Sequence, residues 1–99
     1  MQYNPLPEPK RKYTIYAIID PRTDEYCYVG HTRRYKARQE EHKRATLNPS
    51  DVGHGTRRTK AFLQAMREEG FTPGFEVLEE ITTIRKFAIL REIMWFKRL

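Results

Sequence analysis

The sequence predicts a small α/β domain of the α+β type, with a three-stranded, mainly antiparallel sheet flanked by three helices in the order ββααβα. Two neighbouring segments near the N-terminus are rich in β-branched and aromatic residues and are separated by a polar turn, which predicts a β-hairpin. Helical segments follow the hairpin and enclose one further strand-like segment. The chain has 99 residues, which suits one compact domain with one modest core.

The N-terminal part begins with an extended, basic lead-in at residues 1–12, whose order the sequence leaves open. The folded domain is expected at residues 13–99. Its first two strands are expected at Tyr13–Ile19 and Tyr26–Gly30, and the proline and aspartates between them favour a tight turn.

The rest of the domain follows from helix-start and helix-stop signals. Thr32 is a plausible N-cap for a helix over Arg33–Ala45, because its hydroxyl can accept a backbone hydrogen bond. A second helix is expected at Arg57–Glu69 and should stop at Gly70, since glycine adopts the left-handed conformation of a helix end. The remaining elements are a third strand, Phe75–Ile81, and a last helix, Thr83–Leu99.

Charge and hydropathy limit the partners of the protein. Nineteen Lys and Arg against thirteen Asp and Glu give a formal charge of +6, which favours an anionic partner such as nucleic acid, although it also serves solubility. No apolar run approaches the roughly 18 residues of a membrane span, and the start lacks the apolar block of a signal peptide. We therefore expect a cytoplasmic protein without a membrane partner. A single Cys27 excludes an intrachain disulfide, and no zinc-like spacing is present.

Each strand of the predicted hairpin carries a tyrosine in its interior, Tyr16 in the first and Tyr28 in the second. Strands favour aromatic residues, so each tyrosine taken alone indicates core packing. A pair of phenols at matching places in two adjacent strands also suits a catalytic or phosphate-binding site. Both interpretations remain open at this point.

The first helix carries Arg34, Arg38 and His42 at positions i, i+4 and i+8, which places them on one face. No carboxylate lies among them, and like charges at this spacing destabilise a helix by about 0.2–0.5 kcal/mol per pair. Such a face suits a phosphodiester, because a guanidinium group matches phosphate oxygens. A solvated basic face fits the pattern equally well.

Glu92 in the last helix is the second unusual position. Its helical neighbours are all apolar: Ala88, Ile89, Trp95 and Phe96. Burial of an unpaired carboxylate costs several kcal/mol, about the size of the whole stability of some domains. Glu92 is therefore protonated, paired with a base such as Arg38, or bound to a cation. A structural bridge between Arg38 and Glu92 is the simpler alternative to a metal site.

Taken together, these features resemble the GIY-YIG nuclease family, and most closely the catalytic domain of phage intron-encoded homing endonucleases. The two family tripeptides match Thr14-Ile15-Tyr16 and Tyr28-Val29-Gly30. The family's arginine and the histidine one turn later match Arg38 and His42, and its metal-binding glutamate matches Glu92. Threonine at position 14 departs from the family's first glycine. The asparagine that many members carry after the glutamate helix is either absent or lies beyond the sequence given.

The resemblance implies a mechanism for hydrolysis of DNA phosphodiester bonds. Glu92 would hold one divalent cation, Mg²⁺ or alternatively Mn²⁺, and Arg38 would stabilise charge on the phosphoryl oxygens. Tyr16, or else His42, would take the proton from the attacking water, provided that nearby cations lower the pKa of Tyr16, and Tyr28 would orient the phosphate or water. The residues expected to contact substrate are Gly30, Thr32, Arg34 and His54.

Two other function classes stay open. One is a non-catalytic nucleic-acid-binding module on the same fold, and the other is a regulatory protein that binds an acidic protein surface. The combination of Tyr16, Tyr28, Arg38 and Glu92 favours the nuclease, because binding alone has no need of a carboxylate in an apolar stripe. The sequence leaves open the DNA target, the biological role, the oligomeric state and whether one or both strands are cut.

Overall fold

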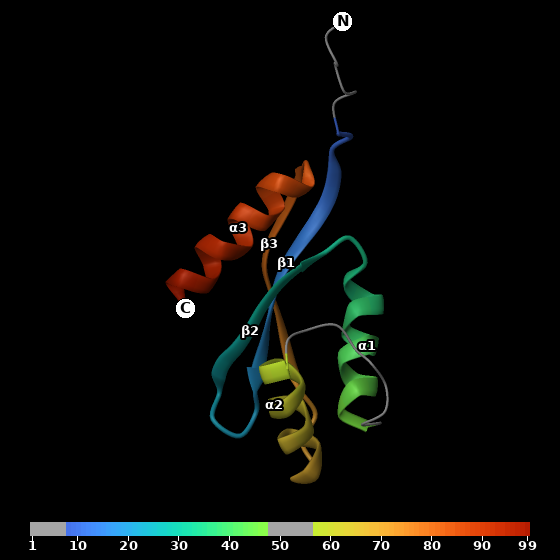
Figure 1. The fold of residues 1–99 in the computed structure, drawn as a ribbon, viewed down its shortest axis with the longest axis vertical. Helices are drawn as coiled ribbons and strands as arrows, with labels where there is room; N and C mark the ends of the chain where they lie inside the picture. The colour runs from blue at the N-terminus through green and yellow to red at the C-terminus, as the bar shows by residue number, and fades with distance from the viewer. Residues whose placement is uncertain (1–7, 48–56) are drawn as a thin grey trace, which may run out of the picture.

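The structure, a computed structural model, describes residues 8–47 and 57–99 (Figure 1). The element order is ββααβα, as predicted. The elements are β1 (Arg11–Asp20), β2 (Glu25–Thr32), α1 (Tyr35–Leu47), α2 (Arg57–Glu68), β3 (Gly74–Thr83) and α3 (Arg85–Arg98). No helix within the described ranges is long and apolar enough to cross a membrane.

The strands form one open sheet in the order β2-β1-β3, and both strand pairs are antiparallel. β1 is therefore the central strand and β2 is an edge strand. The centre of β1 is completely buried from Ile15 to Ile18, because neighbours on both sides and helices on both faces exclude water from it. The edge position of β2 leaves several of its side chains half-buried or exposed. This difference between the two strands decides the environment of their tyrosines.

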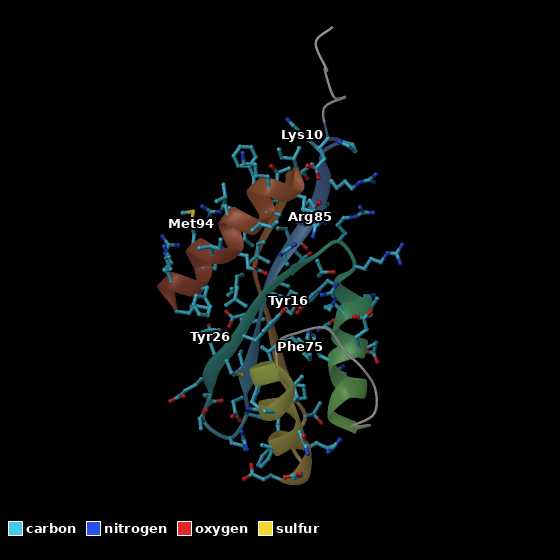
Figure 2. All side chains as sticks on the ribbon, in the orientation of Figure 1. Lys10, Tyr16, Tyr26, Phe75, Arg85 and Met94 are labelled. Carbon is cyan, nitrogen blue, oxygen red and sulfur yellow. The ribbon has the colours of Figure 1, made fainter. Side chains whose placement is uncertain are left out.

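The helices cover opposite faces of the sheet. α1 and α2 pack beside each other against one face, and α3 lies against the other (Figure 1). Figure 2 shows Tyr16 and Phe75 between the sheet and the α1–α2 layer, whereas Met94 lies on the outer side of α3. Because side chains alternate along a strand, neighbouring residues of β2 point to different helical layers. A site built at β2 can thus draw groups from both layers.

The first strand begins two residues earlier than predicted. Arg11 and Lys12 pair with Thr83 and Thr82, because β3 is longer than its apolar segment and supplies backbone partners to the end of the sheet. The predicted lead-in of residues 1–12 was therefore wrong at its boundary. The same pairing holds Thr83 in the sheet, so α3 begins at Arg85 rather than at Thr83. The residues before Glu8 lie outside the described ranges.

Thr32 ends β2 instead of capping a helix that begins at residue 33, so that prediction was wrong. Its Oγ1 accepts a hydrogen bond from the Arg34 N–H at 3.0 Å, which makes a turn of the Ser/Thr type. The first helical hydrogen bond runs from the Arg38 N–H to the Arg34 carbonyl at 2.9 Å. The chain thus needs two residues to leave the edge strand before α1 can start at Tyr35.

The hairpin turn and the end of α2 follow the predicted chemistry. The Asp20 carbonyl accepts hydrogen bonds from the N–H groups of Thr23 and Asp24, at 3.2 and 2.7 Å, and Asp24 adopts a positive φ of 59°. Gly70 ends α2 with a φ of 79°. The N–H of Phe71 bonds to the Met66 carbonyl at 2.9 Å, which completes a Schellman motif. Gly70 as the stop of this helix is confirmed.

Glu79 of β3 fixes the orientation of α3. Its Oε1 accepts hydrogen bonds from Arg91 Nε at 2.8 Å and from Trp95 Nε1 at 3.0 Å. The Arg91 guanidinium lowers the pKa of Glu79 from its ordinary value, and the Trp95 bond adds to this. Since Glu92 lies between these two residues in sequence, the contact also sets the position of Glu92.

We expect acid to release this anchor at a pH well below the ordinary pKa of a glutamate, about 4.3. The folded pKa of Glu79 is depressed, so its stabilising effect is complete above the unfolded pKa and is lost as the pH falls through the folded value. Trp95 is the single tryptophan of the chain, and its fluorescence should therefore report the step. Glu79→Gln should lack this step while far-UV circular dichroism stays unchanged. A fluorescence midpoint at the ordinary glutamate pKa would contradict the assignment of this step to Glu79.

Candidate active site

The two tyrosines of the hairpin lie side by side, as the pairing of neighbouring strands predicted. Tyr16 pairs with Gly30, and Tyr28 pairs with Ile18, so both rings rise from the same face of the sheet. Their ring centroids are 6.0 Å apart. The face carrying these phenols is the one that α1 and α2 cover.

Gly30 is a position of close approach between the edge strand and both rings. A Cβ at residue 30 would lie 2.7 Å from Tyr28 Cε1 and 2.9 Å from Tyr16 Oη. Real Cβ atoms do not approach other heavy atoms so closely, so any side chain would displace the two phenols. The structure thus explains glycine in the Tyr-Val-Gly segment by packing. A contact between Gly30 and substrate stays a prediction.

Tyr16 is joined to His42 in the interior. The Tyr16 hydroxyl and His42 Nε2 are 3.0 Å apart, and both residues are almost completely shielded, with exposed fractions of 0% and 1%. The rings of Tyr35 and Phe75 lie beside this pair. Burial raises the pKa of Tyr16, the nearby Tyr28 raises it further, and Arg38 lowers it by less. The pKa of Tyr16 is therefore raised in the protein alone, and its lowering by Arg38 together with a bound metal stays a prediction.

Tyr28 occupies a more open environment on the edge strand. It is half-buried, and burial raises its pKa. The neighbouring Tyr16 hydroxyl and the charge of Arg38 oppose this rise in the Tyr28 pKa without reversing it, and the charge of Glu92 adds to it. Tyr28 is therefore the phenol that interacts electrostatically with both helical layers, Arg38 from α1 and Glu92 from α3.

The predicted basic face of the first helix is not a uniform surface. Arg38 forms an ion pair with Glu41, with 3.2 Å between Nε and Oε2. His42 is turned into the core, where it meets Tyr16. The prediction that no carboxylate compensates this face was wrong, because Glu41, three residues after Arg38, reaches it across one helical turn. Arg34 precedes the helix and faces a pocket.

Glu92 pairs with His31, at 3.0 Å between Oε1 and Nδ1. The alternative of a structural bridge to Arg38 was wrong, because Arg38 comes from the opposite layer and contacts Glu41 instead. Nor is Glu92 deeply buried: 25% of its side chain is exposed, and the neighbouring Phe96 is 69% exposed. The apolar stripe around Glu92 is thus partly an outer surface of α3. Such a carboxylate keeps its access to water and cations.

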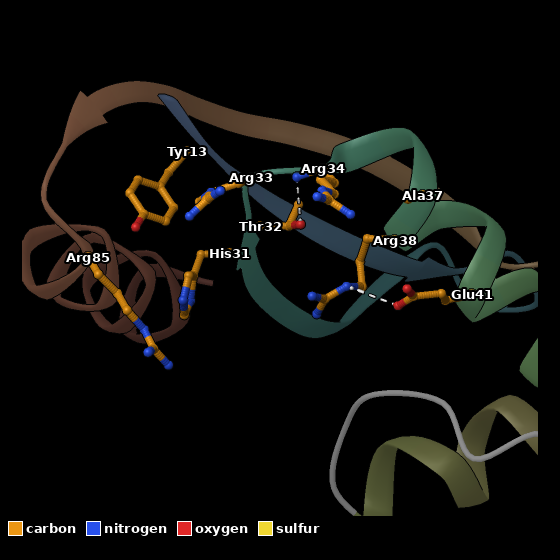
Figure 3. Close-up of a pocket in the computed structure, with 9 residues that line it drawn as sticks. All are labelled: Tyr13, His31, Thr32, Arg33, Arg34, Ala37, Arg38, Glu41 and Arg85. Carbon is orange, nitrogen blue, oxygen red and sulfur yellow. Dashed lines mark hydrogen bonds and ion pairs between the residues drawn. The ribbon is translucent and has the colours of Figure 1, made fainter. Parts of the chain in front are cut away.

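A pocket of about 440 Å³ lies where β2 leaves the sheet, between the first turns of α1 and α3 (Figure 3). Its ionisable Arg, His and Glu side chains come from β2, α1, α3 and the connection between β2 and α1: Arg33, Arg34, Arg38, Arg85, His31 and Glu41. The sequence prediction included Arg34 and Arg38 but missed Arg33, Arg85 and His31. For His31 the signal was present, because it alternates with Gly30 and so faces the same layer as Glu92. Arg85 had no such signal, since only the fold brings α3 to this place.

The structure therefore gathers Tyr16, Tyr28, Arg38 and His42 on one side of β2 and places Glu92 within electrostatic range of Tyr28. Thr32 and Arg34 line the adjoining pocket. His54 lies outside the described residues. In the described part of the chain, no three His, Cys, Asp or Glu side chains are grouped closely enough to hold a metal ion by themselves. Comparison of the chain with protein-family models, with curated proteins and with solved structures finds no match.

Proposed function

We propose that the protein is a metal-dependent endonuclease that hydrolyses DNA phosphodiester bonds at the edge strand β2. The observation that carries the proposal is the placement of a partly exposed phenol, Tyr28, on the edge strand beside Tyr16, with 6.0 Å between their ring centroids. The adjoining pocket is lined by Arg38 from one helical layer and by His31, whose ring bonds to Glu92 from the other layer. The resemblance to GIY-YIG nucleases, which use tyrosine, arginine and glutamate, supports the same function.

The residues present fit one divalent cation. Mg²⁺ usually keeps several water ligands and is bound through one or two carboxylates together with substrate phosphates. Glu92 supplies one such carboxylate, is partly exposed, and has no hydrogen bond to its Oε2 within the described residues. When bound, Mg²⁺ or Mn²⁺ would neutralise charge on the scissile phosphate and on the leaving oxygen.

The side chains of the protein would divide the remaining work. Arg38 would hold the non-bridging phosphoryl oxygens, since it lines the adjoining pocket and its charge acts on the pKa of both phenols. Tyr28 would take the proton from the attacking water, because Tyr28 is partly exposed while Tyr16 is fully buried. Tyr16 would donate a hydrogen bond to Tyr28, and His42 would hold Tyr16 in place. This exchanges the roles that the sequence predicted for the two tyrosines.

A non-catalytic nucleic-acid-binding module is the second candidate. The arginine-lined pocket favours it, because that pocket attracts phosphate without requiring proton transfer. Only a test of chemistry separates the two functions.

Supercoiled plasmid should be nicked in the presence of Mg²⁺ or Mn²⁺ and should remain intact in EDTA. Arg38→Ala, purified by the same procedure, is the control for contaminating nuclease and should bring nicking to background. Retardation of DNA in gels without nicking under either metal would overturn the endonuclease and support the binding module.

A further inference from the structure

The pocket beside the candidate active site has an unusual balance of charge. Four arginines line it, and among the described residues that line it the only carboxylate, Glu41, is paired with Arg38. The guanidinium groups of Arg33, Arg34 and Arg85 have no ion pair with any side chain that the structure describes. Clustered cations repel each other, so this arrangement gains stability when an anion binds. Guanidinium groups match phosphate oxygens in geometry as well as in charge.

The N-terminal end of α1 adds to the positive potential of the pocket, whereas the N-terminal end of α3 is met by a carboxylate. Neither α1 nor α3 has an acidic residue in its first turn, although acidic residues there normally compensate the positive end of a helix. Ile84, at the N-cap of α3, offers no side-chain hydrogen bond. The Arg85 N–H instead donates to the carboxylate of Glu8 at 3.2 Å. A carboxylate distant in sequence thus already occupies this helix end, which leaves the Arg85 side chain to the pocket (Figure 3).

The pocket adjoins the candidate active site through two shared residues. Arg38 lines the pocket and also lowers the pKa of Tyr28. His31 lines the pocket and bonds to Glu92. An anion in the pocket therefore lies next to a phosphate held at Arg38, Tyr28 and Glu92. In size the pocket falls within the range of small-molecule sites, about 300–1,000 Å³, and so exceeds what one phosphate group needs.

We propose that this pocket is a second phosphate subsite, which binds the backbone phosphate adjacent to the scissile one through Arg33, Arg34 and Arg85. The proposal rests on the proposed function for the identity of its ligand, a polynucleotide strand. Two subsites one nucleoside apart fix the strand along the edge of β2, so that the scissile phosphate is presented to Tyr28. Because all contacts are to phosphate, the subsite positions DNA without reading its sequence.

Thymidine 3′,5′-bisphosphate carries two phosphates at the spacing of a nucleic-acid strand and is the probe of choice. In EDTA, the wild-type protein should bind it about tenfold or more tightly than either thymidine 5′-monophosphate or thymidine 3′-monophosphate. The double variant Arg33→Gln, Arg85→Gln should lose this preference. The matched control Lys97→Gln, Arg98→Gln removes two exposed charges at the far end of α3 and should keep it. Calorimetric titration measures all of these affinities.

Equal affinity for the bisphosphate and the monophosphates would overturn the subsite, and so would an equal loss in the two double variants, which would indicate general electrostatic attraction. Inorganic pyrophosphate distinguishes a strand from a free polyphosphate: if it binds as tightly as the bisphosphate, the backbone assignment is wrong. The proposed endonuclease function is tested separately, by the plasmid assay. A preference for bisphosphate that depends on Arg33 and Arg85 supports the subsite whether or not the protein cuts DNA.

Discussion

Replacing Glu92 with glutamine is expected to lower metal-dependent nicking by about 10³-fold or more, while the domain stays folded. Glutamine has the same shape but no charge, so it cannot hold a dication. The pair between Glu92 and His31 is partly exposed, and such pairs contribute at most about 1 kcal/mol to stability. The glutamine oxygen can still accept a hydrogen bond from His31. We therefore expect a nearly unchanged melting temperature beside a large loss of activity.

Glu76→Gln is the matched control for this variant. Glu76 is an exposed carboxylate on β3 that accepts a hydrogen bond from Tyr26, away from the phenol pair. Its replacement removes the same charge and should leave nicking intact. Plasmid nicking and thermal melting of both variants give the comparison. Near-normal nicking by Glu92→Gln would show that Glu92 does not bind the metal ion. A marked fall in the melting temperature of this variant would show that the pair between Glu92 and His31 is a structural bridge.

The order of the elements was readable from the sequence because each element carries a local signal. Two segments rich in β-branched and aromatic residues, separated by a polar turn, indicate the hairpin, and a glycine in the left-handed region ends α2 at Gly70. Boundaries depended on distant partners instead. β1 extends to Arg11 because β3 runs to Thr83, and no local pattern near Arg11 encodes the length of a strand that follows some sixty residues later.

The proximity of the two phenols could be predicted from the sequence, but their different burial could not. Paired strands bring Tyr16 and Tyr28 together whatever the rest of the sheet does, so their proximity followed from the hairpin alone. Which of them is buried depends on where β3 joins. β3 pairs with β1, which makes β1 central and shields Tyr16, and leaves Tyr28 on the edge. The pairing of β3 with β1 rather than with β2 depends on tertiary structure, and it decides which of the two phenols is exposed to water.

The partner of Glu92 could likewise not be identified without the tertiary structure. Spacing along α3 identified an unusual carboxylate, but the distance to Arg38 could not be judged without knowing that α1 and α3 cover opposite faces. His31 was the better candidate on alternation, because it follows Gly30 and so points away from the phenols. Pocket residues such as Arg33 and Arg85 meet only after three elements have packed.

Tyr28→Phe is expected to reduce the nicking rate by about 10²-fold, the usual scale for loss of a general base, with little change in stability. Its hydroxyl lies on the half-exposed edge strand, and the ring that packs against Tyr16 is kept. Tyr16→Phe should instead lower the stability more than the nicking rate. It removes the hydroxyl bonded to buried His42, a loss that costs about 1–3 kcal/mol of stability. The rate should fall by about tenfold at most, through the lost hydrogen bond to Tyr28.

Tyr26→Phe on the same strand is the control for these two variants. Tyr26 is exposed and its hydroxyl donates to Glu76 at 2.7 Å, so its removal should leave both rate and stability near the wild-type values. Nicking rates at saturating DNA, with thermal melts of all three proteins, distinguish the roles, because a proton acceptor affects rate alone whereas a core hydroxyl affects folding first. If Tyr16→Phe loses the larger factor in rate and Tyr28→Phe cleaves normally, the buried phenol is the base. The sheet edge would then have to open for water to reach Tyr16, whose exposed fraction is 0% in the closed domain.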